Sequence, residues 1–257
     1  SIPNISDFSF WKHTCDIFDP SVIINCIAET NFITCENQYS KTLLPNVMIP
    51  AYLAQVANDQ KRRLIHISTD QFYVSDKPLA HTEDEDVRLV NAYAKQKYLA
   101  ENKITSLVND FVIIRTSFLG KSLQGNSMID WFLKQRKAGR SITGYIDAYS
   151  SSLTINQLLI ELKLILERRV IGLFNIGCSE VYNKWDLISR LNSNLPGKGI
   201  EIMKGSVACE QVRRANSCGL DSSKYSNFLQ RRMPDLTGVI NSLTYDILGE
   251  KNEKKFV

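Results

Sequence analysis

The sequence predicts an α/β fold with a doubly wound parallel sheet and a smaller C-terminal lobe. Short, continuously apolar segments rich in β-branched residues alternate along the chain with segments of helical character. Such apolar segments are typical of strands that are buried on both faces of a parallel sheet. The expected strands are 21–28, 63–69, 111–116 and 170–177.

Helices are expected between and after these strands. Ser6 and Asp7 suit the N-cap of a first helix, which ends before Asp19 and Pro20. After Gly177 the alternation loosens, and this indicates a lobe of helices and loops covering one end of the sheet. Ligands in such folds bind at the carboxyl ends of the strands. The other expected helices are 43–58, 90–104, 128–138, 153–168, 185–192 and 234–249.

Composition excludes several classes of protein. The 257 residues are 44% hydrophobic and 23% charged, which is ordinary for a globular protein and excludes a disordered chain. The longest apolar stretch, 158–166, is interrupted by Glu161 and Lys163, so no membrane span is expected. The net charge of +4 is dispersed along the chain and is too weak to argue for nucleic acid. We therefore expect a cytoplasmic protein with neither a membrane nor a nucleic acid as partner.

The cysteines predict free thiols rather than a disulfide framework or a metal site. None of them stands in C-x-x-C spacing, and the chain has only three histidines. Cys26 and Cys178 lie in apolar, strand-like segments, so we expect buried thiols in a reducing compartment. The acidic run 83–86 is interpreted as a solvated loop rather than a cation site. The six cysteines are Cys15, Cys26, Cys35, Cys178, Cys209 and Cys218.

Candidate chemistry follows the second expected strand. That strand ends at Ser68-Thr69-Asp70, and the next helix carries Tyr93 and Lys97, four residues apart and therefore on one helical face. An ammonium beside a phenol lowers the phenol pKa, so that the tyrosine can protonate a developing alkoxide. A Ser or Thr hydroxyl can bind the same oxygen. The Tyr–Lys spacing alone is weak and also fits a surface pair, but the strand ending in Ser-Thr-Asp favours a site that reduces a carbonyl with a nicotinamide.

Several ordered segments carry a family resemblance. The chain resembles the extended short-chain dehydrogenase/reductases, and among them the dTDP-4-dehydrorhamnose reductases and related sugar-nucleotide reductases. Together the segments span nearly the whole chain, and the set is specific although each piece is not. The matching segments are 4–7 (NISD), 20–28 (PSVIINCIA), 64–70 (LIHISTD), 91–101 (NAYAKQKYLAE), 113–118 (IIRTSF) and 213–224 (RRANSCGLDSSK).

The resemblance implies a Rossmann-like fold and a role for each matching residue. Tyr93 would be the general acid, Lys97 would lower its pKa and hold the nicotinamide ribose, and Thr69 would orient the carbonyl. Residues 1–117 and 150–178 would form an N-terminally incomplete dinucleotide-binding domain, and 118–149 with 179–257 the substrate-binding lobe. The cofactor would be NADPH or NADH, bound by Asn25, Cys26, Ile27, Ala28, Ser68, Tyr93 and Lys97.

The resemblance also implies a substrate. It would be a nucleotide-diphospho-4-keto-6-deoxysugar, reduced at C4 for the synthesis of a surface polysaccharide. Arg213 and Asn216 would hold the nucleotide diphosphate, because a guanidinium suits a bidentate contact with phosphate oxygens. A homodimer is left open. The expected substrate-binding residues are Asp70, Gln71, Phe118, Asn126, Arg213 and Asn216.

The chain departs from the family pattern in several places. The glycine fingerprint G-x-x-G-x-x-G and the strand and helix that carry it are absent, and we interpret this as a truncation of about one βαβ unit. Strand 21–28 would then lie at an apolar edge of the sheet. Other departures are expected to shape the substrate pocket. They are Gln71, Leu89, Ala94, Gln96, 149–154 and Arg214.

Two other functions stay open on the same scaffold. A sugar-nucleotide epimerase would retain its cofactor through a redox cycle. A non-catalytic relative would bind a sugar nucleotide or regulate a partner. Trp11, Trp131 and Trp185 are interpreted as packing residues on amphipathic helices.

Overall fold

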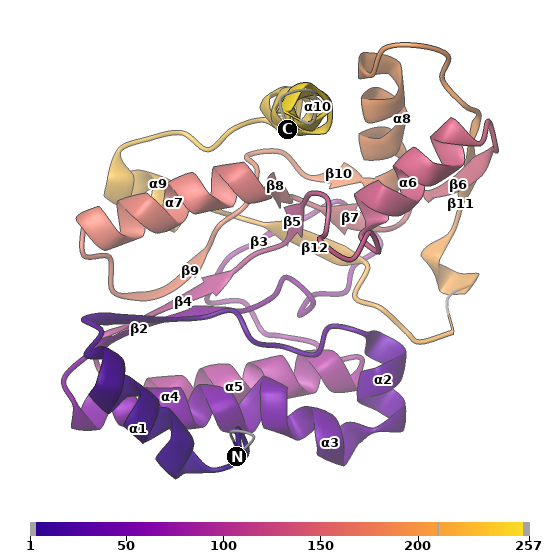
Figure 1. Ribbon diagram of the computed structural model, residues 1–257. Helices are drawn as coiled ribbons and strands as arrows, with labels where there is room; N and C mark the ends of the chain where they lie inside the picture. Colours follow the sequence, from indigo (N-terminus) through magenta and orange to yellow (C-terminus); the bar gives the residue numbers. More distant parts are fainter. Residues whose placement is uncertain (1–3, 210, 254–257) are drawn as a thin grey trace.

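A four-stranded parallel sheet forms the centre of the molecule (Figure 1). The computed structural model describes residues 4–209 and 211–253. The strand order is β1-β2-β4-β9, and each neighbouring pair is parallel. The predicted α/β fold with a parallel sheet is therefore confirmed. The bounds are Val22–Asn25 for β1, Arg63–Ile67 for β2, Phe111–Arg115 for β4 and Gly172–Asn175 for β9.

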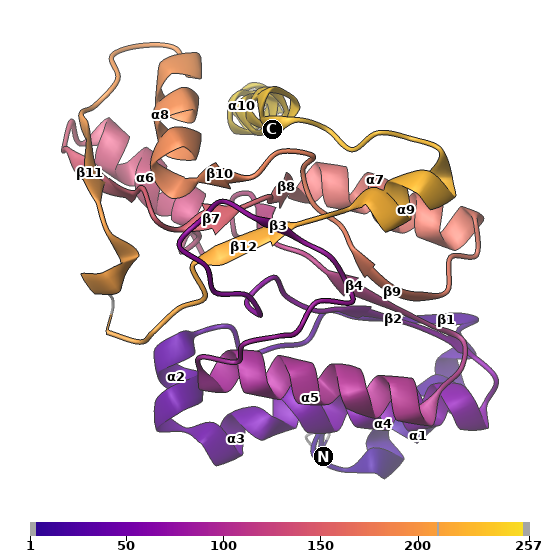
Figure 2. The ribbon, with the colours of Figure 1, turned by 180° about the vertical axis from the view of Figure 1, so that it is seen from behind.

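Helices cover both faces of this sheet. Helices α1 (Phe8–Phe18), α4 (Ile49–Asp59) and α5 (Ala92–Leu107) form a layer below it in Figure 1, and α7 (Ile155–Glu167) lies above (Figures 1 and 2). Successive strand residues point to opposite faces. Leu64 accordingly packs in the cluster with α4, whereas its neighbour Ile65 packs in the larger core on the other side.

The segment before α4 contains more helix than the sequence predicts. Helices α2 (Phe32–Asn37) and α3 (Tyr39–Leu43) precede a π-helical turn, Leu44–Met48, that leads directly into α4. Prolines at the starts of the turn and of α4 lack the amide hydrogen needed to continue the α-helical hydrogen bonds. Within the turn the buried Asn46 side chain accepts from the amide of Glu29 at 2.8 Å and donates to its carbonyl at 3.1 Å. This exchange holds the end of the loop after β1.

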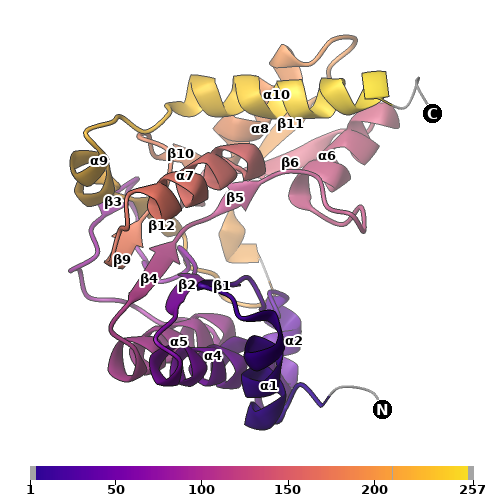
Figure 3. The ribbon, with the colours of Figure 1, turned by 60° about the vertical axis from the view of Figure 1, so that its left-hand side comes forward.

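Outside the central sheet the chain forms short strands that the sequence did not reveal, most of them in the C-terminal lobe (Figure 3). Helices α6, α8, α9 and α10 accompany three small sheets. These strands have two to four residues each, too few for a recognisable pattern. The helix bounds are Met128–Lys137, Lys184–Asn194, Ser223–Leu229 and Leu236–Glu253. The strands are β3 (Ala80–His81), β5 (Phe118–Leu119), β6 (Ile142–Tyr145), β7 (Tyr149–Ser150), β8 (Leu153–Thr154), β10 (Tyr182–Asn183), β11 (Ile202–Gly205) and β12 (Ser217–Leu220).

One small sheet connects the two predicted domains. Its order is β10-β7-β12-β3, so the strand at Ala80–His81 pairs with a strand that lies far along the chain. The approach is close at Gly219, where a Cβ would lie 2.3 Å from the Leu79 carbonyl oxygen. The predicted domain division itself stays a prediction. Strand β1 lies at an edge of the central sheet, and its Ile24 is 44% exposed.

Among the described helices, none has the length and apolar character needed to cross a membrane.

Candidate active site

The start of helix α5 holds Tyr93 beside the end of β2. The Asn91 side chain caps the helix by accepting from the amide of Ala94 at 2.8 Å, and Glu36 accepts from the amide of Ala92 at 2.7 Å. These bonds fix the first turn of α5, which carries Tyr93. The Tyr93 side chain is hydrogen-bonded to that of Thr69, and both residues are buried. The structure thus brings together two of the predicted catalytic residues.

The Tyr93 phenol differs from the expectation in its acidity. Its pKa is raised above the ordinary value, mainly because burial disfavours the phenolate, while the hydrogen bond with Thr69 acts in the opposite direction. The charge of Asp70 adds to the increase. The sequence led us to expect that Lys97 lowers this pKa. This expectation is wrong: burial raises the pKa of Tyr93, and the Lys97 amine makes its hydrogen bonds with Ile67 and His66 instead.

Lys97 is almost completely enclosed, with 1% of its surface exposed. Its Nζ donates to the Ile67 carbonyl at 2.8 Å and lies 3.0 Å from Nε2 of His66. Desolvation lowers the pKa of the Lys97 amine to about 8, although Glu101 and Cys26 favour its charged form. The pKa of His66 is itself lowered well below its usual value by burial and by Lys97. His66 is a site residue that the sequence analysis did not single out.

A second buried hydrogen-bond network includes Ser68, the residue before Thr69. The Ser68 hydroxyl donates to Glu101 at 2.5 Å, and Glu101 also accepts from Arg115 at 2.8 Å. Arg115 in turn donates to the Tyr73 hydroxyl at 2.9 Å. Ser68 was predicted to bind the cofactor, but its hydroxyl is engaged in this network beneath the site. The network ties α5 to β2 and β4.

The loop after β1 lies next to Lys97. Asn25 is buried, and its Oδ1 accepts from the amide of Ile27 at 2.9 Å. Cys26 was predicted to be a buried thiol, and this prediction is wrong: Cys26 is exposed, because the strand ends at Asn25. Cys15, Cys35, Cys178 and Cys218 are buried free thiols, as predicted, and the side chain of Cys209 lies outside the part of the chain that the structure describes. Ile27 is also exposed, and Ala28 is half-buried.

A pocket of about 300 Å³ opens between the helical layer and the C-terminal lobe. Thr69 and Tyr93 are not among its lining residues, but they adjoin it through Asp70, which follows Thr69, and through Phe32, whose ring contacts that of Tyr93. Asp70 and Gln71, which the sequence analysis expects to bind substrate, both line the pocket, and their role stays a prediction. The Gln71 side chain donates to Asp70 at 3.0 Å, while its buried Oε1 has no hydrogen-bond partner among the described residues. Gln71 therefore combines a place in the pocket lining with an acceptor atom that no described residue satisfies. Other lining residues include Phe32, Trp131, Tyr145, Tyr149, Lys184 and Arg214.

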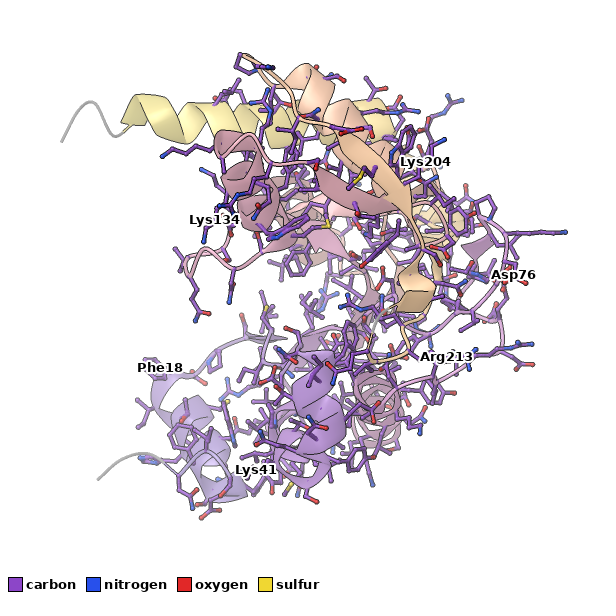
Figure 4. All side chains as sticks on the ribbon, turned by 90° about the vertical axis from the view of Figure 1, so that its right-hand side faces the viewer. Phe18, Lys41, Asp76, Lys134, Lys204 and Arg213 are labelled. Atoms are coloured by element: carbon purple, nitrogen blue, oxygen red, sulfur yellow. The ribbon has the colours of Figure 1, made fainter. Side chains whose placement is uncertain are left out.

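Four predicted substrate residues lie outside the pocket lining. Phe118 is half-exposed on β5, and Asn126 bonds with Ser122 in a surface turn. Asn216 donates to the Ser75 carbonyl at 2.9 Å. Arg213 lies between β11 and β12, at the level where the helical layer meets the C-terminal lobe (Figure 4). Their predicted roles stay predictions.

The pocket is also lined by two residues, Trp131 and Lys184, that the sequence analysis did not assign to a binding site. Trp131 was interpreted as a packing residue, but it is 45% exposed and lines the pocket. Lys184, at the start of α8, also lines the pocket and carried no signal in the sequence. Arg214, by contrast, was expected to shape the pocket because it replaces a family proline, and it is a lining residue. Trp11 and Trp185 do pack as predicted, and their indole nitrogens donate to the carbonyls of Ile5 and Ile202.

Two departures from the family pattern have a structural rather than a pocket role. Gln96 was expected to shape the pocket, but it is buried and accepts from Asn46 at 2.8 Å. Ala94 packs with Phe72, Tyr73 and Leu220. Both side chains point from α5 into neighbouring elements. Gln71, Tyr149 and Arg214 do line the pocket, and whether they shape a substrate site stays a prediction.

The acidic run 83–86 is tied to the fold at two points. Glu83 accepts from the amide of Asn175 at 2.7 Å, and Glu85 pairs with the His81 ring at 2.7 Å. Within residues 4–209 and 211–253, the structure contains no group of three or more His, Cys, Asp or Glu side chains arranged to hold a metal ion.

The comparisons with known proteins decide the family. The family described as RmlD substrate binding domain matches residues 2–240. The chain belongs to this family. It is 24% identical to the spore coat polysaccharide biosynthesis protein SpsK of Bacillus subtilis, over 81% of this chain and 72% of that protein. It is 32% identical to the dTDP-4-keto-6-deoxy-D-glucose reductase of Streptomyces niveus, over 45% of this chain and 41% of that protein.

A solved structure shows the same fold. The dTDP-4-dehydrorhamnose reductase of Bacillus anthracis, in complex with NADP, superposes with a TM-score of 0.86 at 18% identity. The match covers 93% of this chain and 85% of that one. The predicted resemblance to this group of extended short-chain dehydrogenase/reductases is confirmed, and so is the predicted class of enzyme, an oxidoreductase.

Proposed function

We propose that this protein reduces the C4 keto group of a nucleotide-diphospho-4-keto-6-deoxysugar with NADPH or NADH, in the cytoplasmic synthesis of a surface polysaccharide. The observation that carries the proposal is the buried hydrogen bond between Thr69 and Tyr93 beside a pocket with an unsatisfied acceptor on Gln71. The names of the relatives support sugar-nucleotide reduction.

The residues around the ends of β1 and β2 fit a nicotinamide cofactor. Parallel strands that end together present their loops to a ligand on that side. The exposed loop residues Cys26 and Ile27 provide a surface there, and Lys97 lies close enough to interact electrostatically with Cys26. Lys97 would hold the nicotinamide ribose, with Asn25 and Ala28 completing the cofactor-facing loop. The bound cofactor would supply the hydride that adds to C4.

The protein's own groups would supply the proton. Tyr93 would transfer its phenolic proton to the carbonyl oxygen as the alkoxide develops, while the Thr69 hydroxyl would hold that oxygen in place. The product alcohol thus gains one hydride at carbon and one proton at oxygen. A phenol is already protonated at neutral pH, as a general acid must be, and the burial of Tyr93 raises its pKa further. Burial of both residues keeps water away from the reacting oxygen.

The pocket suits the proposed substrate. Lys184 and Arg214 would attract the diphosphate, since both cations line the pocket. Trp131 and Tyr145 offer aromatic surface against which a nucleotide base or sugar ring can pack. Arg213 and Asn216 do not line this pocket, so they would bind the diphosphate only where it extends beyond the pocket. The proposed partner is accordingly a nucleotide-diphosphate sugar, with a homodimer as the proposed assembly.

The test replaces Tyr93→Phe and follows the oxidation of NADPH with dTDP-4-keto-6-deoxysugar. We expect turnover to fall by about 10²–10⁴-fold while cofactor and sugar-nucleotide binding persist. Tyr98→Phe, one turn and a residue further along α5, is the matched control and should keep turnover. Undiminished turnover in Tyr93→Phe overturns the assignment of the acid.

The same assay separates the alternatives. A reductase releases one oxidised cofactor for each sugar reduced, whereas an epimerase regenerates its cofactor and releases none. A protein that binds no nicotinamide nucleotide by calorimetry would instead support the non-catalytic interpretation.

A further inference from the structure

A continuous chain of hydrogen bonds joins the loop after β1 to Lys97. The amide of Ile27 donates to Oδ1 of Asn25 at 2.9 Å, and Nδ2 of Asn25 lies 3.0 Å from Nδ1 of His66. On the other side of the ring, Nε2 of His66 lies 3.0 Å from Nζ of Lys97. Lys97 also donates to the Ile67 carbonyl at 2.8 Å. Asn25 and His66 are register partners on β1 and β2.

The donors and acceptors in this chain determine one another. Since Oδ1 of Asn25 accepts from Ile27, the amide nitrogen of Asn25 faces the ring and can only donate. Nδ1 of His66 must then accept, so a neutral ring carries its proton on Nε2. That proton points at Nζ of Lys97, where only an uncharged amine has a lone pair to receive it. With a neutral Lys97 amine, each hydrogen bond in this chain therefore pairs a donor with an acceptor.

A charged Lys97 requires the opposite arrangement. An ammonium has donors only, so Nε2 of His66 would have to accept and the ring proton would move to Nδ1. This proton would meet the amide nitrogen of Asn25, and the clash is relieved only if the Asn25 side chain turns over. The amide of Ile27 would then lose its acceptor.

We propose that His66 is a positioning residue that couples the charge of Lys97 to the orientation of Asn25, and through it to the loop 25–28. The coupling itself is a property of the protein alone. Its consequence for cofactor binding rests on the proposed function, because only there does this loop face the cofactor.

The surroundings make the coupling strong. Asn25, His66 and Lys97 are all at most 1% exposed, so water cannot satisfy a misdirected proton. The charged and titratable groups that face Lys97 are Glu101 on its own helix and Cys26 on the loop after β1. Glu101 is itself paired with Arg115 of β4, which limits its influence. A pKa near 8 for Lys97 places the transition in an accessible pH range.

The test measures the His66 ring tautomer by ¹⁵N NMR, without cofactor or substrate. The chain has only three histidines, so the ring signals can be assigned with a His66→Gln variant. We expect the Nε2–H form at about pH 10 and the Nδ1–H form at about pH 7, with the Ile27 amide resonance moving in step. The same tautomer at both pH values would overturn the proposal.

Two variants sharpen the test. Lys97→Met removes the titrating amine, and His66 should then stay in the Nε2–H form throughout; a tautomer change that persists in this variant counts against the coupling. Asn25→Asp supplies acceptors to both Ile27 and His66, so it should hold the Nδ1–H form at every pH. An Asn25→Asp protein in the Nε2–H form contradicts the proposal. Since none of these measurements involves turnover, their failure is distinct from failure of the proposed function.

Discussion

The ring of Phe32 lies edge-on against the ring of Tyr93, with centroids 5.3 Å apart, and the guanidinium of Arg214 lies 5.0 Å from the Phe32 centroid. These contacts join the start of α2, the start of α5 and the segment before β12. It covers the proposed general acid, which is only 7% exposed. Phe32 therefore connects the helical layer to the C-terminal lobe at the mouth of the pocket.

Replacement of Phe32→Ala should destabilise the protein and uncover Tyr93. Loss of the ring pair and the cation–π contact, together with the buried apolar surface, predicts a fall of about 2–3 kcal/mol in the free energy of unfolding. Phe228→Ala is a suitable control, because Phe228 is half-exposed and its ring is 6.4 Å from that of Phe174. Urea denaturation measures the free energy of unfolding of both variants. Equal losses would contradict a stabilising role for the contacts of Phe32 with Tyr93 and Arg214.

The Glu101–Arg115 pair predicts a large loss of stability when it is broken. Both side chains are buried, and Glu101 accepts from Arg115 and Ser68. Glu101→Gln keeps the shape but leaves the Arg115 charge buried without its partner, so we expect a loss of about 3–5 kcal/mol in the free energy of unfolding.

Glu167→Gln is the matched control for this change. It breaks the exposed pair with Lys163 on α7, and exposed pairs contribute about 0–1 kcal/mol. If denaturant midpoints of the two variants fall together, the buried network does not hold α5 to the sheet.

The buried Lys97 predicts a specific pH dependence of stability. Its pKa is lowered from 10.5 to about 8, so between these values the folded protein binds fewer protons than the unfolded chain. Stability contributed by this group therefore rises with pH across that window and is lowest below it. The whole shift corresponds to about 3 kcal/mol.

The contribution can be isolated by comparison with Lys97→Met. The free energy of unfolding of wild type minus that of the variant should rise from about pH 8 to about pH 10 and stay flat below about pH 7. Groups other than Lys97 cancel in this difference. Parallel pH profiles for the two proteins would mean that the amine keeps its ordinary pKa in the fold.

Local pattern was sufficient for the central sheet. The four apolar segments became β1, β2, β4 and β9, because strands buried on both faces need continuous β-branched sequence. The spacing of Tyr93 and Lys97 on one helix was equally local. The short strands β3, β7, β10 and β12 escaped prediction because each has too few residues for a period and is stabilised by partners distant in sequence.

The candidate site likewise has features that the sequence predicts and features that only the fold reveals. The sequence by itself determined the family, the parallel sheet and the cluster after β2, because these depend on local propensity and on ordered motifs. Only the tertiary structure decided that Lys97 contacts His66, that Cys26 is exposed, and that Trp131, Lys184 and Arg214 share a pocket. Burial, pKa values and hydrogen-bond partners depend on the residues that surround a group in space, and chain order does not specify those neighbours.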